Sequence, residues 1–496
     1  MEEIELKLQV PASSRAAVDA AVAGRARAPR QRLRAVYFDT AERALARSGM
    51  ALRIRHEGRR RIQTLKAAGD DGITRFEHEV ALADPPAEDA LADPALHAGT
   101  PAGDRLLKLL HKAGSPALVA LYRTDILRRS RRLRTPLGVV ELSFDQGAVI
   151  AGDERAPVSE LEIELVSGSA GAVVATARGW ALRHGLWLDT RSKAERGDLL
   201  ARGEAMAPHR TASPVALSES MSLAQGRRAV LLSCLEQVSV NGSQVASGCY
   251  GDEHVHQLRI GLRRLRTALR LFGDGAPAGD IGLRAAELFR HLGAARDRAA
   301  VAQPLEQALN AALAEMGLPL RAPPLPAGEA QVEPAQLMRL APAQSLLLDL
   351  LALTQAPAAA AEQAQAGSLR QRLVQHIRRW HGTVRTDARR FAALDDTARH
   401  TLRKRAKSLR YGIEFAAGLF NRREVKRYLK PLRRLQECLG EITDTTVALD
   451  AYRSLGECDP PAAFALGWLA ACKQALLRKS GRPVAAFLKA RPFWRG

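Results

Sequence analysis

Charged and apolar residues alternate in two stretches that lie far apart along the chain. At the N-terminus Glu3, Glu5 and Lys7 alternate with apolar residues, and residues 159–166 repeat this pattern with glutamates at positions 160, 162 and 164. A β-strand sends successive side chains to opposite faces, so each stretch predicts a strand with one charged and one apolar face. Two interpretations fit such a strand: a solvated face, or a group of carboxylates whose mutual repulsion is relieved by a metal ion.

The first two hundred residues contain several more strands of this kind. Roughly eight are predicted, at residues 3–8, 37–40, 50–56, 61–66, 75–82, 120–129, 138–144 and 159–166. Helical patterns intervene at residues 12–23, 104–113 and 170–184, so this part is predicted to be α+β. The charged faces carry both signs. Because arginine and lysine bind phosphate oxygens and carboxylates hold divalent cations, the mixture favours an inside-out barrel with a charged tunnel over a sheet whose charged faces meet water.

Beyond residue 216 the apolar period becomes that of helices, after a stretch at 203–216 with two prolines that is predicted to be a linker. One predicted helix carries a continuous basic stripe made of His256, Arg259, Arg263, Arg266 and Arg270. A second helix, 144 residues later, repeats the stripe with His400, Arg403, Lys407 and Arg410. The repeated register predicts a duplicated helical unit, with the proline-rich residues 322–334 between its halves.

The net charge of the chain indicates an anionic partner. The 496-residue chain carries +21, of which +5 lies in residues 1–210 and +16 in the remainder. The basic stripes are interpreted as lacking carboxylates at i+4, so their self-repulsion favours a bound polyanion over a solvated face. Aromatic residues make up 4% of the chain and no nucleic-acid motif is visible, which argues against specific nucleic-acid binding.

Cysteine usage and apolar runs bear on the compartment. The five cysteines are scattered without C-x-x-C spacing, as in reduced proteins. The acidic N-terminus predicts no signal peptide, and no apolar run reaches the length of a membrane span. We therefore expect a cytoplasmic protein without a membrane partner.

Six motifs in order resemble the CYTH family, the triphosphate tunnel metalloenzymes. They are Glu3-x-Glu5-x-Lys7, Tyr37-Phe38-Asp39-Thr40, Leu52-Arg53-Ile54-Arg55, Gln63-Thr64-Leu65-Lys66, Ser159–Leu165 and Ser192–Gly197. The resemblance covers residues 1–202 and implies an α+β fold, an eight-stranded antiparallel β tunnel with flanking helices. It also implies that the tunnel binds a triphosphate group together with Mg²⁺ or Mn²⁺.

The same resemblance assigns roles to residues of the tunnel. It implies that phosphate is bound by Lys7, Arg53, Arg55, Lys66, Arg123 and Lys193. It implies that metal is held by Glu3, Glu5, Glu162 and Glu164, with further tunnel carboxylates at Glu77, Glu79, Glu141 and Asp145. The expected catalytic set is Glu3, Glu5, Lys7, Lys66 and Lys193. Since Arg123 and Arg128 cannot share a face of a regular strand, one of them must point away from the tunnel.

The two His-led helices resemble the CHAD family, the conserved-histidine α-helical domains, over residues 217–490. The expected repeats span about 217–321 and 337–490. This resemblance implies helical bundles around a basic channel for polyphosphate. The implied ligands are His256, Arg259, Arg263 and Arg266 in the first repeat and His400, Arg403, Lys407 and Arg410 in the second.

Together the two resemblances indicate a metal-dependent inorganic triphosphatase that converts tripolyphosphate to pyrophosphate and phosphate, with a polyphosphate-binding appendage. One alternative is a hydrolase or cyclase acting on an organic triphosphate, such as thiamine triphosphate or a nucleoside triphosphate. Another is a non-catalytic polyphosphate-binding protein.

Overall fold

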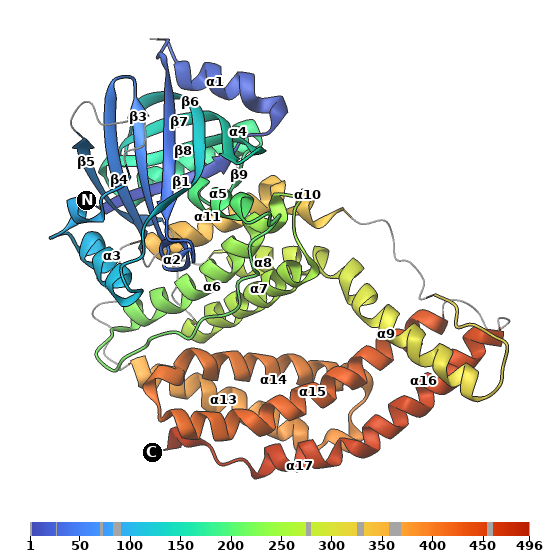
Figure 1. Ribbon diagram of the computed structural model, residues 1–496. Coiled ribbons are helices and arrows are strands. Elements are labelled where there is room, and N and C mark those ends of the chain that lie inside the picture. Colours follow the sequence, from blue (N-terminus) through green and yellow to red (C-terminus); the bar gives the residue numbers. More distant parts are fainter. Residues whose placement is uncertain are drawn as a thin grey trace. The chain divides into compact units, whose positions relative to one another are not determined.

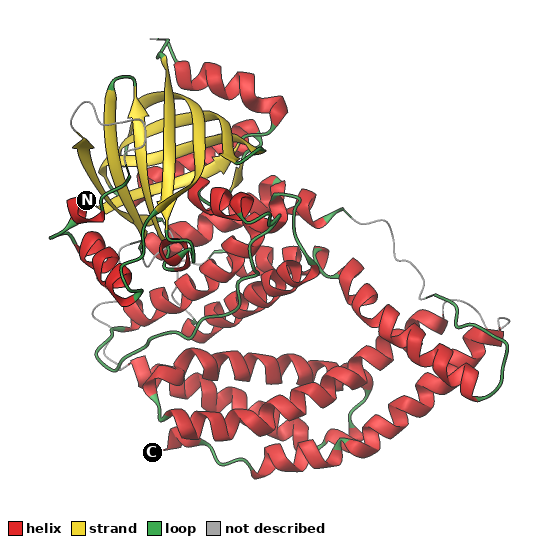
Figure 2. Cartoon of the chain, viewed as in Figure 1, coloured by secondary structure: helices red, strands yellow, loops and turns green. Residues whose placement is uncertain are grey.

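The computed structural model describes residues 2–25, 27–69, 73–82, 91–273, 279–324, 332–356, 369–453 and 460–495, and for Glu2, Arg495 and residues 294–303 the backbone alone. The chain forms two compact units (Figures 1 and 2). The first contains Met1–Thr211, Leu235–Leu258 and Pro334–Ala356, and the second contains Ala212–Cys234, Arg259–Glu333 and Pro357–Gly496. No helix in these described ranges is both long enough and apolar enough to cross a membrane.

The first unit is built on a closed antiparallel barrel. Its strands are β1 (Glu2–Gln9), β2 (Arg30–Asp39), β3 (Met50–Glu57), β4 (Arg60–Ala68), β5 (Thr74–Leu82), β6 (Val119–Thr135), β7 (Gly138–Ala151), β8 (Glu154–Gly168) and β9 (Trp187–Leu188). They follow the order β5-β4-β3-β2-β6-β7-β8-β1-β9, and pairing of β1 with β5 closes eight of them into a ring. The short β9 continues the sheet beside β1. The predicted α+β class and eight-stranded barrel are confirmed.

Several strands are longer than the sequence pattern predicts. β2 begins at Arg30, although only its end at residues 37–40 is predicted, because its first outward side chains are exposed arginines instead of apolar residues. β7 continues through Gly147, which pairs with Ile126 of β6. A Cβ atom at Gly147 would lie 2.0 Å from the Asp125 carbonyl oxygen, so the close approach of β6 and β7 requires glycine there.

One apolar cluster lies outside the barrel wall, as an inside-out barrel requires, whereas a smaller one lies on the strand faces that also carry Arg128 and Asp145. Helix α4 (Ala170–His184) packs against β1, β7 and β8. On β3 and β4, Leu52 and Leu65 are fully buried in one cluster with Leu106 and Leu110 of α3 (Pro101–Lys112). The other helices wholly in this unit are α1 (Arg15–Ala23), α2 (Ala44–Arg47), α5 (Lys193–Ala201), α10 (Pro334–Arg339) and α11 (Ala341–Gln355).

The second unit is helical, which confirms the predicted C-terminal class. It contains α8 (Ile281–His291), α9 (Ala294–Glu315), α13 (Leu369–Arg389), α14 (Asp396–Ala416), α15 (Arg422–Arg453), α16 (Pro460–Lys479) and α17 (Gly481–Lys489). Helices α6 (Leu223–Ala246) and α7 (Asp252–Phe272) each contribute residues to both units. Within the second unit α14 packs between α13 and α15, and α15 contacts α16 and α17. The two helices predicted to carry basic stripes are α7 and α14.

Candidate active site

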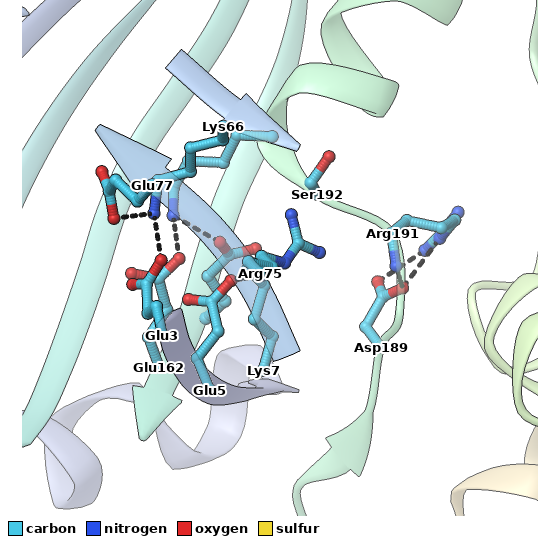
Figure 3. Close-up of polar contacts among 12 residues, drawn as sticks. Glu3, Glu5, Lys7, Lys66, Arg75, Glu77, Glu162, Asp189, Arg191 and Ser192 are labelled. Carbon is cyan, nitrogen blue, oxygen red and sulfur yellow. Dashed lines mark hydrogen bonds and ion pairs between the residues drawn. The ribbon is translucent and has the colours of Figure 1, made fainter. Parts of the chain in front are cut away.

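Four carboxylates of β1, β5 and β8 meet with cations inside the barrel. Lys66 Nζ lies 2.9 Å from a carboxylate oxygen of Glu3 and 2.9 Å from one of Glu77 (Figure 3). The pair of Lys66 on β4 with Glu3 on β1 skips β5, so it crosses the interior of the barrel. Glu5 pairs with Lys7 and with Arg75 Nε, the latter at 2.9 Å, and it faces Glu164 in the register of β1 and β8. We call Glu3, Glu5, Glu77 and Glu164 the first carboxylate group.

Burial and mutual repulsion act against full ionisation of this group. Burial raises the pKa of Glu3 to about 8 against the pull of Lys66, and Glu5 and Glu77 add to the rise. Burial also raises the pKa of Glu164, again with neighbouring carboxylates contributing. Glu77 differs, because Lys66, a hydrogen bond with Glu3 and the nearby Arg53 together outweigh the effect of burial and lower its pKa to about 2. Additional positive charge near Glu3 and Glu164 would therefore favour their charged forms.

A second carboxylate group consists of Asp145, Glu160 and Glu162, which offer oxygens within 4.8 Å of one another. Lys193 Nζ lies 2.6 Å from Asp145 and 2.9 Å from Glu162, and it also contacts Glu160. Two arginines complete the balance: Arg128 pairs with Asp145 at 2.6 Å and with Glu162, and Arg196 pairs with Glu160. These contacts hold the pKa of Glu160 and of Glu162 below the ordinary range in spite of complete burial.

Lys193 owes its position to the start of α5. Ser192 caps this helix: its Oγ accepts a hydrogen bond from Glu195 N at 3.1 Å, and its own N–H donates to the Glu195 carboxylate at 2.7 Å. This reciprocal cap satisfies two backbone donors and places Lys193 at the first helical position. Arg196 follows one turn later on the same side of the helix, so both cations reach Glu160.

The arginines of β3 contact carboxylates of β3 and β5. Arg53 Nη1 donates to Tyr37 Oη at 3.3 Å, and its Nη2 lies 4.0 Å from Glu77. Arg55 pairs with Glu57 at 2.7 Å and with Glu79 at 3.1 Å. Burial and the neighbouring Arg53 lower the pKa of Arg55.

The structure brings nearly all of the predicted tunnel residues together, with one clear exception. Arg123 is exposed, and Arg128, five residues along the same strand, lies on the opposite face in contact with the second carboxylate group. Glu141 pairs with the exposed Arg132 at 3.4 Å, and it faces Glu164 of the first carboxylate group in the register of β7 and β8. Sequence reasoning gave no role to Arg75 or Arg196, left open whether Arg123 or Arg128 faces the tunnel, and placed Glu160 on a charged strand face without assigning it a ligand role. Arg75 and Glu77 are two residues apart on one strand, so their shared face could have identified Arg75 as a tunnel residue.

One quoted motif residue has a structural role. The buried carboxylate of Asp39 accepts hydrogen bonds from the backbone N–H groups of Leu45 and Ala46, each at 2.9 Å. It thereby ties the end of β2 to the start of α2, and it lies outside both carboxylate groups.

The two groups differ in how well they suit a divalent cation. In the second group three cationic side chains already stand among three carboxylates. In the first group burial and the neighbouring carboxylates raise the pKa of Glu3 and of Glu164, so a bound cation would stabilise their charged forms. Oxygen ligands of this kind are what Mg²⁺ and Mn²⁺ prefer. The first group therefore fits a metal ion.

In the second unit the basic stripes of α7 and α14 approach each other. Arg270 on α7 donates to Ser408 Oγ on α14 at 2.6 Å, and the Arg264 guanidinium stacks on Phe415 at 5.1 Å. Burial, together with Arg263, Arg403 and Arg410, lowers the pKa of Lys407 to about 7, with Asp444 opposing the shift. We call Arg263, Arg403, Lys407 and Arg410 the basic cluster.

Other stripe residues surround this cluster or lie apart from it. Arg259 is buried and stacks on Phe289 at 4.6 Å, while Arg266 is exposed. Burial and neighbouring cations lower the pKa of His400. His256 falls in the first compact unit. The expectation that the stripes lack carboxylates at i+4 is wrong for Arg410, which pairs with Glu414 at 3.3 Å.

Comparisons with known proteins agree with both predicted resemblances. The CYTH domain matches residues 1–197 and the CHAD domain matches residues 229–453. An inorganic triphosphatase from Haemophilus influenzae is 30% identical over 169 residues, which are 33% of this chain and 44% of that protein. The match thus spans less than half of the length of this relative.

Two solved structures also resemble parts of the chain. A CHAD domain from the plant Ricinus communis is 28% identical, with a TM-score of 0.45, over 57% of this chain and 98% of that one. A candidate adenylyl cyclase from Hippeastrum with a dominant triphosphatase activity is 20% identical, with a TM-score of 0.30, over 42% of this chain and 98% of that one. By its domain matches, this chain is a CYTH domain followed by a CHAD domain, and it resembles bacterial inorganic triphosphatases.

Proposed function

We propose that the tunnel hydrolyses inorganic triphosphate to pyrophosphate and phosphate with the help of Mg²⁺ or Mn²⁺. The observation that carries this proposal is the pair of buried carboxylate groups, each interleaved with lysine and arginine, inside a closed barrel. A linear polyanion needs cations along its length, and its metal ion needs carboxylates beside them. The similarity to an inorganic triphosphatase supports the same substrate.

Each side chain has a role in this proposal. The phosphate chain is bound and held in line by Lys7, Arg53, Arg55, Lys66, Lys193 and, in place of Arg123, Arg128. The metal would be held by Glu3, Glu5, Glu77 and Glu164, where a cation would stabilise the charged forms of Glu3 and Glu164. When bound, the metal supplies positive charge against the phosphate oxygens. Because the tunnel residues are largely buried, they act in an environment from which bulk water is excluded.

Glu162 has a place between the two groups. Its carboxylate pairs with Lys193 at 2.9 Å and with Arg128, while its strand neighbour Glu164 belongs to the first group. Triphosphate oxygens compete with Glu162 for these two cations, so substrate binding frees this carboxylate. A freed carboxylate beside the phosphate chain is then able to orient the attacking water.

We further propose that the basic cluster of the second unit binds polyphosphate without cleaving it. Burial and the three neighbouring arginines lower the pKa of Lys407 to about 7, so part of this shift reflects a local excess of positive charge. A polyanion relieves this repulsion. Arg259, Arg266, His256 and His400 are the remaining expected ligands along the two stripes.

The decisive experiment is phosphate release by the full chain from tripolyphosphate, pyrophosphate, long-chain polyphosphate, thiamine triphosphate and ATP, each with Mg²⁺ or Mn²⁺. We expect tripolyphosphate to be cleaved with the highest kcat/KM, and Glu5→Gln to abolish this release. Preference for thiamine triphosphate or ATP would instead assign an organic triphosphate. Binding of tripolyphosphate without release would assign a non-catalytic role.

A further inference from the structure

The backbone before Lys193 links two cations of the tunnel. Strand β9 pairs with β1 at Leu8 and Gln9, and Asp189 N donates to the Lys7 carbonyl oxygen at 3.0 Å. Four residues after Asp189, Lys193 begins α5 and reaches the second carboxylate group. The positions of Lys7 and Lys193 are therefore coupled through residues 187–192, which we call the anchor segment.

The anchor segment depends on partners from elsewhere to fix its backbone. β9 has two residues and is the last strand in the sheet order, so its outer edge has no neighbouring strand in the described sheet. Its N–H groups on that edge need other acceptors, because a buried donor without a partner is unfavourable. Asp189 organises the turn from within by accepting from Arg191 N, Nε and Nη2 at 2.8–3.0 Å.

A glutamine on α11 supplies the first outside contact. Gln344 is 2% exposed, and its Oε1 accepts a hydrogen bond from Leu188 N at 2.7 Å. Its Nε2 donates to the Met338 carbonyl oxygen at 2.6 Å, which fixes the orientation of the amide. One side chain thus substitutes for the missing neighbour strand of β9.

A serine on α6 supplies the second contact. Ser243 is completely buried, and its Oγ accepts from Thr190 N at 3.0 Å while donating to the Leu188 carbonyl oxygen at 3.3 Å. The Arg339 guanidinium lies over the Trp187 ring at 4.7 Å, and its Nε donates to the Ala246 carbonyl oxygen at 2.6 Å. Packing against Trp187 therefore adds to the hydrogen bonds that hold the anchor segment. These helices fall within the residues matched by the CHAD domain, yet they belong to the compact unit of the barrel.

We infer that Ser243 and Gln344 are positioning residues of the tunnel, which hold the anchor segment and through it set the place of Lys193. This inference rests on the proposed function of the tunnel. Neither side chain contacts the carboxylate groups, so they act through the backbone. Lys193 Nζ meets Asp145 at 2.6 Å and Glu162 at 2.9 Å, and contacts this short are lost when the helix start shifts by an ångström.

The inference has a consequence for the role of the helical half. Residues 1–202 by themselves would lack both hydrogen-bond partners of the anchor segment. The CHAD part therefore contributes to the tunnel chemistry as well as carrying its own basic cluster.

The test uses the full chain with Ser243→Ala and Gln344→Ala. The matched control is Asp349→Ala, also on α11, which removes an ion pair with Arg178 of α4 and so loosens the same helix without touching the anchor segment. We expect kcat/KM for tripolyphosphate to fall about 10- to 100-fold in the first two variants and to stay within twofold in the control. Equal losses in all three variants would overturn the inference.

A double-mutant cycle separates positioning from general stability. In a Lys193→Gln background, Ser243→Ala should lower kcat/KM no further, because the side chain that it positions is already gone, while its effect on Tm should persist. Additive losses in kcat/KM would contradict the inference.

A measurement independent of turnover keeps the two proposals distinguishable. Amide hydrogen exchange in residues 187–196 should quicken in Ser243→Ala and Gln344→Ala and stay unchanged in Asp349→Ala. If the wild-type chain cleaved no triphosphate, the proposed function would fall, and this exchange pattern would still decide whether the anchor segment is held as described. Unchanged exchange in both variants would overturn the inference.

Discussion

The tunnel and the basic cluster both gather cationic side chains, but they balance charge in opposite ways. In the tunnel Lys66 and Lys193 each contact at least two carboxylates within 3 Å. In the basic cluster Lys407 is surrounded by three arginines, and the carboxylates that oppose them are Asp444 beside Arg403 and Glu414 beside Arg410. A site of alternating signs selects a ligand by geometry and admits a metal ion, whereas a site with an excess of one sign selects by charge and needs no metal. On the proposed function, one chain would therefore offer two kinds of phosphate site.

Metal removal should produce the largest difference between the tunnel and the basic cluster. With EDTA we expect tripolyphosphate hydrolysis to stop completely, because the first carboxylate group would then repel the substrate, and to return when Mg²⁺ or Mn²⁺ is added. Binding of labelled long-chain polyphosphate to the same protein should continue in EDTA. Hydrolysis that survives chelation and dialysis would show that the mechanism needs no metal. Loss of both hydrolysis and polyphosphate binding in EDTA would show that the two sites do not differ in their need for metal.

A pair of arginines on one strand tests which face of β6 lines the tunnel. Arg128→Ala should lower kcat/KM for tripolyphosphate by roughly 10- to 150-fold, the equivalent of about 1.5–3 kcal/mol for lost charge-assisted contacts. Arg123→Ala is the matched control, since its side chain is exposed on the opposite face. Steady-state kinetics of both variants decide the point. A larger effect at Arg123 would mean that the register of β6 differs from the one described.

This pair also shows where sequence reasoning reached its limit. Alternation placed Glu3, Glu5 and Lys7 on one face correctly, because β1 is regular along its pairing with β8. On β6 the register shifts where Tyr37 pairs with Tyr122 and Phe38 pairs with Ala120, which leaves Leu121 as an extra residue. Arg123 and Arg128 both follow this bulge, five residues apart on the regular part of β6, so they lie on opposite faces. Alternation alone shows that one of the two arginines faces the tunnel but does not say which one.

The anchor segment marks a second limit. Capping of α5 was readable from Ser192 and Glu195, three residues apart. The contacts of Ser243 and Gln344 join residues more than fifty positions apart in the sequence, and these two side chains belong to helices that are assigned to another domain by their pattern. Only the folded chain places them beside β9.

Charge reversal tests whether the basic cluster binds the polyanion. Arg263→Glu with Arg403→Glu should weaken binding of long-chain polyphosphate about tenfold or more at low salt, because two cations of the cluster become anions. The matched control is Arg422→Glu with Arg423→Glu, which makes the same change in net charge at exposed positions on α15. Titration at two salt concentrations should show a shallower salt dependence in the first variant alone. If both pairs weaken binding equally, net charge rather than the cluster binds the polyanion.

The smallest expected effect concerns pH and the basic cluster. The pKa of Lys407 is lowered to about 7 by burial and by Arg263, Arg403 and Arg410, so its ammonium is present below pH 7 and is lost as the pH rises above it. A bound polyanion favours the charged form, and binding near neutral pH should therefore take up a proton. We expect the affinity for long-chain polyphosphate to fall about two- to fivefold between pH 6 and pH 8.5, less than the tenfold per pH unit that one fully coupled proton allows.

Lys407→Arg keeps the charge at every pH and should flatten this profile, while the tunnel activity of the variant should keep the pH profile of the wild type. Calorimetry in buffers of different ionisation enthalpy would measure the proton uptake directly. An unchanged pH profile in Lys407→Arg would show that another group titrates, and that charge excess at this lysine does not govern the site.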